Sequence, residues 1–237
     1  MTTTTISRMT ITEQGPAVLS RIAACEPSRD CPLCPRLAAF REGWRTSEPD
    51  WHNAPVPTFI APEGDRSVQM LVVGLAPGLR GANRTGRPFT GDYAGDLLYM
   101  MLKRHGFAHG DYRADPADGL QLRRSAITNA VRCVPPENKP VGAEIAACRD
   151  FLIATIGRFE NLKAILTLGR IAHDSTLRAL GLRLADAPFS HGGAHDAGPF
   201  RIFSSYHCSR YNTNTGRLTE AMFAEVLGAL ARHVGSE

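Results

Sequence analysis

The pattern of apolar positions divides most of the chain into short buried strands that alternate with helix-length segments. Four apolar runs are strand-length and are followed by glycine, asparagine, histidine or proline, at 68–74, 125–131, 164–168 and 200–206. Helical patterns follow at 92–104, 142–159, 170–180 and 217–233. Strands that alternate with helices indicate parallel βαβ units, so we expect an α/β fold, a three-layer αβα sandwich around a parallel sheet.

The unusual residues of the chain lie where the predicted strands end. Gly74-Leu-Ala-Pro-Gly78 follows the first run, Asn129 lies at the end of the second, Gly169 follows the third and His207 follows the fourth. In open parallel sheets, ligands bind beyond the carboxyl ends of the strands. The sequence therefore predicts a ligand site at this edge of the sheet.

Composition favours an ordinary globular protein. We expect one domain over residues 1–237, with 1–24 forming a partly ordered N-terminal extension. No apolar run approaches the roughly 18 residues of a membrane span, and the N-terminus lacks the apolar core of a signal peptide. We therefore expect a cytoplasmic monomer with no membrane contact.

Arginine is grouped rather than spread evenly, although the net charge of +4 is mild. Arg80, Arg84 and Arg87 lie in one glycine-rich loop, Arg123 is followed by Arg124, and the segment 210–217 begins and ends with arginine. Scattered arginine is commonly a solvated surface. If the three groups converge in space, a polyanion is the natural partner.

Four cysteines form a candidate metal site. Cys31-Pro-Leu-Cys34 has the spacing of a metal-binding turn, and Cys133 and Cys148 add two thiols across a proline-rich loop. Four thiolates bind either zinc or a [4Fe–4S] cluster, and the wide second pair favours the cluster. The alternative is that Cys133 and Cys148 are buried apolar residues. Cys25 competes for a ligand position, and Cys208 is interpreted as a bystander beside a histidine.

Several strand-end groups have the properties needed to hold a flat heterocycle. The Gly74–Gly78 turn can present backbone N–H groups but lacks the Gly-Lys-Ser/Thr of a nucleotide-binding loop. Phe89 supplies an aromatic face, Asn129 an amide that both donates and accepts, and His207 a donor. Taken singly, Phe89 would be a core ring and Asp92 a helix cap. Together, they predict a base-binding pocket.

Five features in this order resemble the uracil-DNA glycosylase superfamily, and in particular its iron–sulfur type-5 branch, often called the B-type enzyme. They are the four-cysteine pattern, Gly74-Leu-Ala-Pro-Gly78, Gly86-Arg-Pro-Phe-Thr-Gly-Asp92, Thr128-Asn-Ala-Val-Arg-Cys133 and His207-Cys-Ser-Arg-Tyr-Asn-Thr-Asn-Thr-Gly-Arg217. The resemblance covers nearly all of residues 31–219. It implies a central four-stranded parallel sheet, a structural [4Fe–4S] cluster on Cys31, Cys34, Cys133 and Cys148, and association with the nucleoid. It also implies removal of uracil, and of other deaminated bases, from DNA.

The resemblance also implies roles for individual residues. Gly74, Leu75 and Ala76 would line the pocket, Phe89 would stack on the flipped base, Asn129 would recognise its edge, and His207 would face the carbonyl oxygen beside the scissile nitrogen. Relatives place a polar or acidic residue where this chain has Leu75, so Asp92 becomes the candidate for positioning water. The expected DNA contacts are Arg80, Arg84, Arg87, Arg210, Tyr211 and Asn212. Cys208 stands where proline is common in relatives.

Two other functions fit parts of the sequence. A non-catalytic nucleic-acid-binding module stabilised by zinc or a cluster would need the cysteines, but it has no need for Phe89, Asn129 and His207 to converge. A metal-dependent hydrolase could combine His207 with carboxylates, and would need histidines at ligand spacing. The candidates for that metal site are Asp92, Asp96, His191, His195 and His207.

Overall fold

Within residues 26–235, the central sheet has six strands, and its four inner strands are parallel. The four parallel strands are those predicted: β2 (Met70–Gly74), β5 (Ser125–Asn129), β6 (Ala164–Leu168) and β8 (Phe200–Ser205). Two short antiparallel edge strands, β1 (Phe59–Ile60) and β7 (Ala194–Ala197), complete the order β1-β5-β2-β6-β8-β7. The sequence did not predict these edges, because a two- to four-residue strand is too short to show alternation.

The computed structural model describes residues 26–235, so the expected N-terminal extension and Cys25 lie outside the described residues. The four predicted helices are confirmed as α4 (Tyr93–Arg104), α5 (Gly142–Gly157), α6 (Arg170–Ala179) and α8 (Glu220–Val234). Elements that the pattern did not predict are α2 (Pro35–Ser47), α3 (Ala82–Thr85), α7 (Arg210–Asn214), 3-10 helices at Asp65–Ser67 and Pro136–Asn138, and a hairpin of β3 (Ala108–His109) and β4 (Gln121–Leu122).

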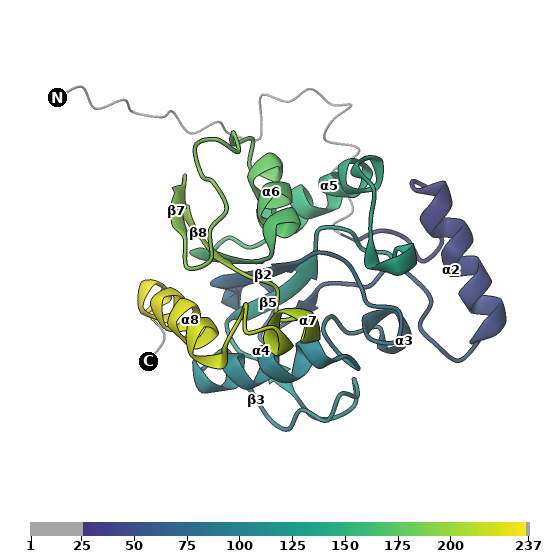
Figure 1. The fold of residues 1–237 in the computed structure, drawn as a ribbon, viewed down its shortest axis with the longest axis horizontal. Coiled ribbons are helices and arrows are strands. Elements are labelled where there is room, and N and C mark those ends of the chain that lie inside the picture. The colour runs from purple at the N-terminus through teal and green to yellow at the C-terminus, as the bar shows by residue number, and fades with distance from the viewer. Residues whose placement is uncertain (1–25, 236–237) are drawn as a thin grey trace.

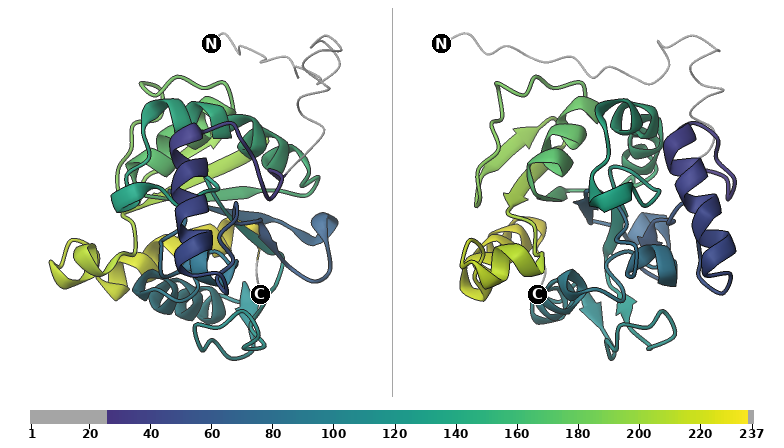
Figure 2. Two further views of the ribbon diagram at one scale, coloured as in Figure 1. Left: turned by 90° about the vertical axis from the view of Figure 1, so that its right-hand side faces the viewer. Right: turned by 45° about the vertical axis from the view of Figure 1, so that its right-hand side comes forward.

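Helices cover both faces of the sheet, which confirms the three-layer arrangement (Figures 1 and 2). Alternate side chains of β2 face opposite layers. Met70 and Val72 belong to the apolar core shared with α4 and α8, whereas Leu71 and Val73 belong to the core shared with α5 and α6. All five residues of β2 are buried, as expected for a parallel strand covered on both faces.

The strand register places the functional ends of the strands together. Gly74, the last residue of β2, pairs with Asn129, the last residue of β5. On the other side, Leu168 of β6 pairs with Ser205 of β8, two residues before His207. The carboxyl edge of the sheet is therefore one continuous site.

Among residues 26–235, none of the helices combines the length and apolarity that crossing a bilayer requires.

A third, smaller apolar cluster joins α2 to the rest of the fold. Leu37 of α2 packs with Val131, Cys133 and Cys148. Figure 1 shows α2 at the right-hand edge of the molecule. The cysteine region thus connects the N-terminal helix to the central sheet.

Candidate active site

A cavity of about 710 Å³ opens beyond the carboxyl ends of the central strands. Most of the predicted pocket residues line it: Leu75, Ala76, Phe89, Asp92, Asn129 and His207. Other residues that line the cavity were not predicted from the sequence: Leu79, Tyr93, Asn138 and Ser209. Asn138 comes from the proline-rich loop, whose only sequence signal was its position between two cysteines. The predicted set therefore converges on one site.

Gly74 allows two pocket side chains to lie against the backbone. A Cβ atom at this position would lie 2.3 Å from Asn129 Oδ1 and 2.7 Å from Phe89 Cζ. Both contacts are shorter than real Cβ atoms tolerate, so any other residue would displace the amide or the ring. Gly74 does not line the cavity itself, but it sets the positions of the two groups that do.

Asp92 both caps a helix and lines the cavity. It precedes α4 and caps its N-terminus, because its side chain accepts a hydrogen bond from Gly95 N at 3.3 Å. A Cβ atom at Gly81 would lie 2.4 Å from Asp92 Oδ2, so the glycine-rich loop closes over the carboxyl group. Burial raises the pKa of Asp92, partly opposed by the backbone N–H groups of the first turn.

His207 lies beside Phe89 in the cavity. The two ring centroids are 5.9 Å apart with planes inclined by 28°. Burial lowers the pKa of His207 to about 4, so the imidazole is neutral at neutral pH. Asn212 Nδ2 donates to His207 O at 2.8 Å, which fixes the backbone that carries the ring. Asn212, predicted as a DNA contact, therefore also anchors His207.

Most of the residues predicted to contact DNA surround the mouth of the cavity or lie near it. Arg80 and Arg210 line the cavity, and Arg84 is exposed one turn beyond Arg80. The side chain of Tyr211 is 72% exposed, the highest value among the large apolar residues described as exposed. Arg210 lies 5.3 Å from the centre of the Tyr93 ring. These side chains form a cationic and aromatic rim.

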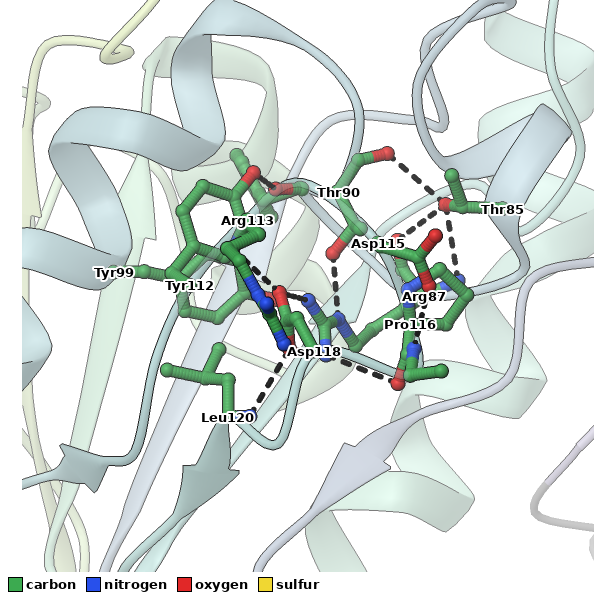
Figure 3. Close-up of polar contacts among 12 residues, drawn as sticks. Thr85, Arg87, Thr90, Tyr99, Tyr112, Arg113, Asp115, Pro116, Asp118 and Leu120 are labelled. Atoms are coloured by element: carbon green, nitrogen blue, oxygen red, sulfur yellow. Dashed lines mark hydrogen bonds and ion pairs between the residues drawn. The ribbon is translucent and has the colours of Figure 1, made fainter.

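Arg87 is a correction to the sequence prediction. It is buried, and its guanidinium forms two hydrogen bonds with the carboxylate of Asp118 (Figure 3). It therefore does not contact DNA from the surface. Arg123 and Arg124 are also separate from the site, because they precede β5 at the opposite edge of the sheet. Only part of the arginine clustering thus faces the cavity.

The four predicted metal ligands lie around one small cavity. Cys31, Cys34, Cys133 and Cys148 all line it. Burial raises the pKa of Cys34 to about 11 and that of Cys148 to about 12. Within residues 26–235, no group of three or more histidine, cysteine or acidic side chains is placed to hold a single metal ion.

N–H groups point at two of these thiols. Arg41 Nη1 donates to Cys133 Sγ at 3.5 Å, and the backbone N–H of Arg132 donates to Cys148 Sγ at 3.4 Å. Arg41 is itself buried, and its Nη2 donates to Cys31 O. These donors favour the thiolate form of the two cysteines and act against burial, which favours the neutral thiol.

The alternative hydrolase site does not assemble. His191 Nδ1 accepts a hydrogen bond from Tyr206 N at 3.2 Å, and the His191 ring stacks on that of Tyr206. His195 lies in β7, and Asp96 is exposed on α4. None of these three residues lines the cavity that holds Asp92 and His207.

Cys208 is a packing residue. Its side chain is fully buried, and its Sγ donates to Ala94 O at 3.4 Å, in the first turn of α4. Burial raises the pKa of the thiol, so it is not a nucleophile at neutral pH. This placement agrees with its interpretation as a bystander and explains why a small apolar side chain follows His207.

Comparison with known proteins agrees with this geometry. A family profile described as Uracil DNA glycosylase superfamily matches residues 61–231. A type-5 uracil-DNA glycosylase of Thermus thermophilus is 42% identical over 224 residues, which cover 92% of this chain and 100% of the relative. A type-5 uracil-DNA glycosylase of Pyrobaculum aerophilum is 37% identical over 87% of this chain and 90% of the relative. One of Mycobacterium tuberculosis is 38% identical over 87% of this chain and 79% of the relative. The chain therefore belongs to the uracil-DNA glycosylase superfamily, in its type-5 branch.

Proposed function

We propose that this protein hydrolyses the N-glycosidic bond of uracil in DNA and leaves an abasic site. The observation that carries the proposal is the convergence of Phe89, Asn129 and His207 on one cavity at the carboxyl edge of the sheet. A base within a duplex is inaccessible, so it must rotate out of the stack at a cost of a few kcal/mol. The cavity of about 710 Å³ has ample room for one such base.

Recognition of the base would depend on two side chains. The Phe89 ring offers a stacking surface, and base–aromatic stacking contributes about 1–3 kcal/mol. Asn129 is only 3% exposed, and its amide can donate to one atom of uracil and accept from the next. This pairing distinguishes uracil from cytosine, which presents the opposite pattern of donor and acceptor. The other deaminated bases implied by the resemblance are part of the same proposal.

Bond cleavage builds negative charge on the departing uracil and positive charge on the sugar. Because His207 is neutral at neutral pH, it can donate an N–H to the uracil oxygen as that oxygen becomes anionic. A donor aimed in this way is worth roughly 3–4 kcal/mol in the transition state. Asp92 lines the same cavity, and its carboxylate would hold the attacking water and offset the charge on the sugar. Leu75 has no polar group for either task.

The rim of the cavity would hold the DNA open. Tyr211 is the exposed aromatic side chain best placed to fill the space that the base vacates, as wedge residues do at kinked base steps. Arg80, Arg84 and Arg210 would bind phosphates. A non-catalytic binding module would share this rim but would not need His207 and Asp92 in the same cavity.

The four cysteines would hold a [4Fe–4S] cluster with a structural role. The support is that four thiols from two distant parts of the chain line one cavity, and that Arg41 and the Arg132 amide donate toward two of them. Such N–H···S contacts stabilise the anionic sulfur ligands of clusters. Zinc on the same thiolates is the alternative. Either group would connect α2 to the central sheet.

The test of the proposed activity uses matched duplexes. A 30-base-pair duplex with one uracil and an identical duplex with thymine are incubated with the protein and then treated with alkali, which cleaves abasic sites. We expect strand cleavage of the uracil duplex only, and about 100-fold slower single-turnover cleavage by Asp92→Asn. Intact uracil DNA after incubation with folded wild-type protein would contradict the proposal. Full activity of Asp92→Asn would remove Asp92 from the mechanism.

The metal is tested on protein purified without oxygen. We expect about four iron and four sulfide per chain and a broad visible absorption that bleaches on oxidation. One zinc per chain and a colourless protein would establish the alternative. A folded protein with neither element would remove the metal site altogether.

A further inference from the structure

We propose that Arg87 and Asp118 are positioning residues for the base-stacking ring. Together with Tyr99 and Tyr112, they form a buried network, here named the Arg87 clamp, that fixes the backbone on both sides of Phe89. The inference rests on the proposed function, since it assigns the clamp to the uracil-stacking face of that site. Figure 3 shows how the members of the clamp surround the Arg87 guanidinium.

The ion pair at the centre of the clamp is rigid. Arg87 Nη1 donates to Asp118 Oδ1 at 2.9 Å, and Nη2 donates to Oδ2 at 2.8 Å. Asp118 is itself fixed, because it accepts from the backbone N–H groups of Arg113 at 2.8 Å and Leu120 at 3.0 Å. Both charged side chains are buried, so neither is free to exchange its partner for water.

The clamp extends directly to the loop that carries the stacking ring. Arg87 Nε donates to Thr90 Oγ1 at 2.7 Å. This bond links a residue before Phe89 to the residue after it. The hydroxyl of Tyr99 donates to Pro88 O, and that of Tyr112 donates to Phe89 O at 3.2 Å. Their rings lie 5.6 and 5.8 Å from the guanidinium carbon. Each carbonyl adjoining the Phe89 Cα thus has a donor from the network.

Phe89 needs this support because its backbone is in the left-handed region, with φ +52°. For a bulky residue that conformation is unfavourable, and it persists only where the surroundings determine it. Gly95 leaves space for the Phe89 carbonyl, since a Cβ atom there would lie only 1.9 Å from the oxygen. Without the clamp, the loop can relax to negative φ, which moves the ring away from Asn129.

Stability alone does not account for a buried ion pair at this position. Replacing such a pair by uncharged residues of similar size is often neutral for folding, whereas removing one partner is strongly destabilising. What an ion pair provides is direction, because two parallel N–H···O bonds hold the guanidinium in one plane. A neutral replacement can therefore recover folding without recovering the position of the ring.

The test uses that difference. In Arg87→Met/Asp118→Asn, methionine keeps the buried volume and asparagine keeps an acceptor for a backbone N–H. We expect a Tm within a few degrees of wild type but single-turnover uracil release about 10- to 100-fold slower at saturating enzyme, since a misplacement of about 1 Å costs up to about 100-fold. A wild-type rate in this folded variant would show that the pair is only structural and would overturn the inference.

Two controls identify Phe89 as the group through which the clamp acts. In a Phe89→Leu background, the clamp substitutions should slow release by less than about twofold, because residues that act as one unit are not additive. The Arg158–Asp65 pair, at 2.8 Å, lies outside the site, so Arg158→Met/Asp65→Asn should leave the rate unchanged. Additive loss in the Phe89→Leu background would contradict positioning through the ring.

A milder variant covers the case in which the double variant does not fold. Tyr112→Phe deletes only the hydroxyl that donates to Phe89 O, and it should slow release about three- to tenfold with little change in KM. An unaltered rate in Tyr112→Phe would overturn the inference. If wild-type protein released no uracil, that result would contradict the proposed function itself. An active wild type with fully active clamp variants would reject the clamp alone.

Discussion

Two cavities of this molecule, the base cavity and the cysteine cavity, differ in how their walls are held. Both bring together residues more than 90 positions apart in the chain, Phe89 with His207 in one and Cys31 with Cys133 in the other. The base cavity is about 710 Å³, and its walls are fixed by close backbone approach at Gly74, by the Asp92 cap and by the Arg87 clamp. The cysteine cavity is small and has thiols where the other has amide, carboxyl and imidazole groups.

The ligands proposed for the two cavities would explain this difference, because one would exchange and the other would stay bound. A base enters and leaves in every turnover, so the fold must preorganise its site without help from the ligand. The proposed metal cluster would remain bound, so it would itself hold the wall residues in place and contribute directly to folding. Damage to the cysteine cavity should therefore appear mainly as lost stability, and damage to the base cavity mainly as lost rate.

The largest effect is expected from the loss of one of the proposed cysteine ligands. Cys148→Ser should lower Tm by more than about 10 °C and reduce the iron content, because the binding free energy of a structural metal group is largely folding free energy. Calorimetry and iron analysis on the same sample measure both. Cys208→Ala is the matched control, since that thiol is also buried but belongs to the α4 contact. Unchanged Tm and iron in Cys148→Ser would remove this cysteine from the metal site.

The next effect is confined to rate. His207→Ala should slow single-turnover uracil release about 100- to 1,000-fold, because it removes a donor aimed at the leaving oxygen. Affinity for uracil-containing DNA should change much less, as the rim of the cavity remains. Rapid-quench kinetics and gel-shift titration separate the two. Equal losses in rate and affinity would place His207 in ground-state binding instead.

The pH dependence of stability tests the environment of His207 in the base cavity. The pKa of His207 is about 4 in the folded protein and about 6.5 when unfolded, so below pH 6.5 the unfolded chain binds a proton that the folded chain does not. The free energy of unfolding should therefore fall between pH 6.5 and 4, by at most about 3 kcal/mol. His207→Gln lacks this titration and should show a flatter profile in urea melts. Parallel profiles for the two proteins would contradict the neutral imidazole.

The smallest effect is expected at the rim. Tyr211→Ala should change stability by less than about 0.5 kcal/mol, because the side chain is 72% exposed. Uracil release from duplex DNA should slow about three- to tenfold, while release from single-stranded DNA changes little because no duplex needs to be opened. The exposed Met100, on the outer side of α4, provides the matched control Met100→Ala. Equal losses on both substrates would argue against a wedge.

Local sequence determined most of the framework and much of the site. The strands β2, β5, β6 and β8 were visible because each is a short apolar run with a distinctive residue after it. Since parallel strands end at one edge of a sheet, the residues after those runs had to meet. The sequence alone therefore predicts that Asn129 and His207 lie in one pocket.

Tertiary structure decided the features that depend on partners far along the chain. The residues around Arg87 have the composition of a surface loop, so the sequence predicts an exposed side chain. Asp118, 31 positions later, provides the carboxylate that allows Arg87 to be buried. The role of Cys208 was hidden in the same way, because its acceptor is Ala94, 114 positions earlier. Periodicity reports only neighbours within a few residues. Whether a charge or a thiol is buried depends on which distant groups the fold brings to it, and only the three-dimensional arrangement contains that information.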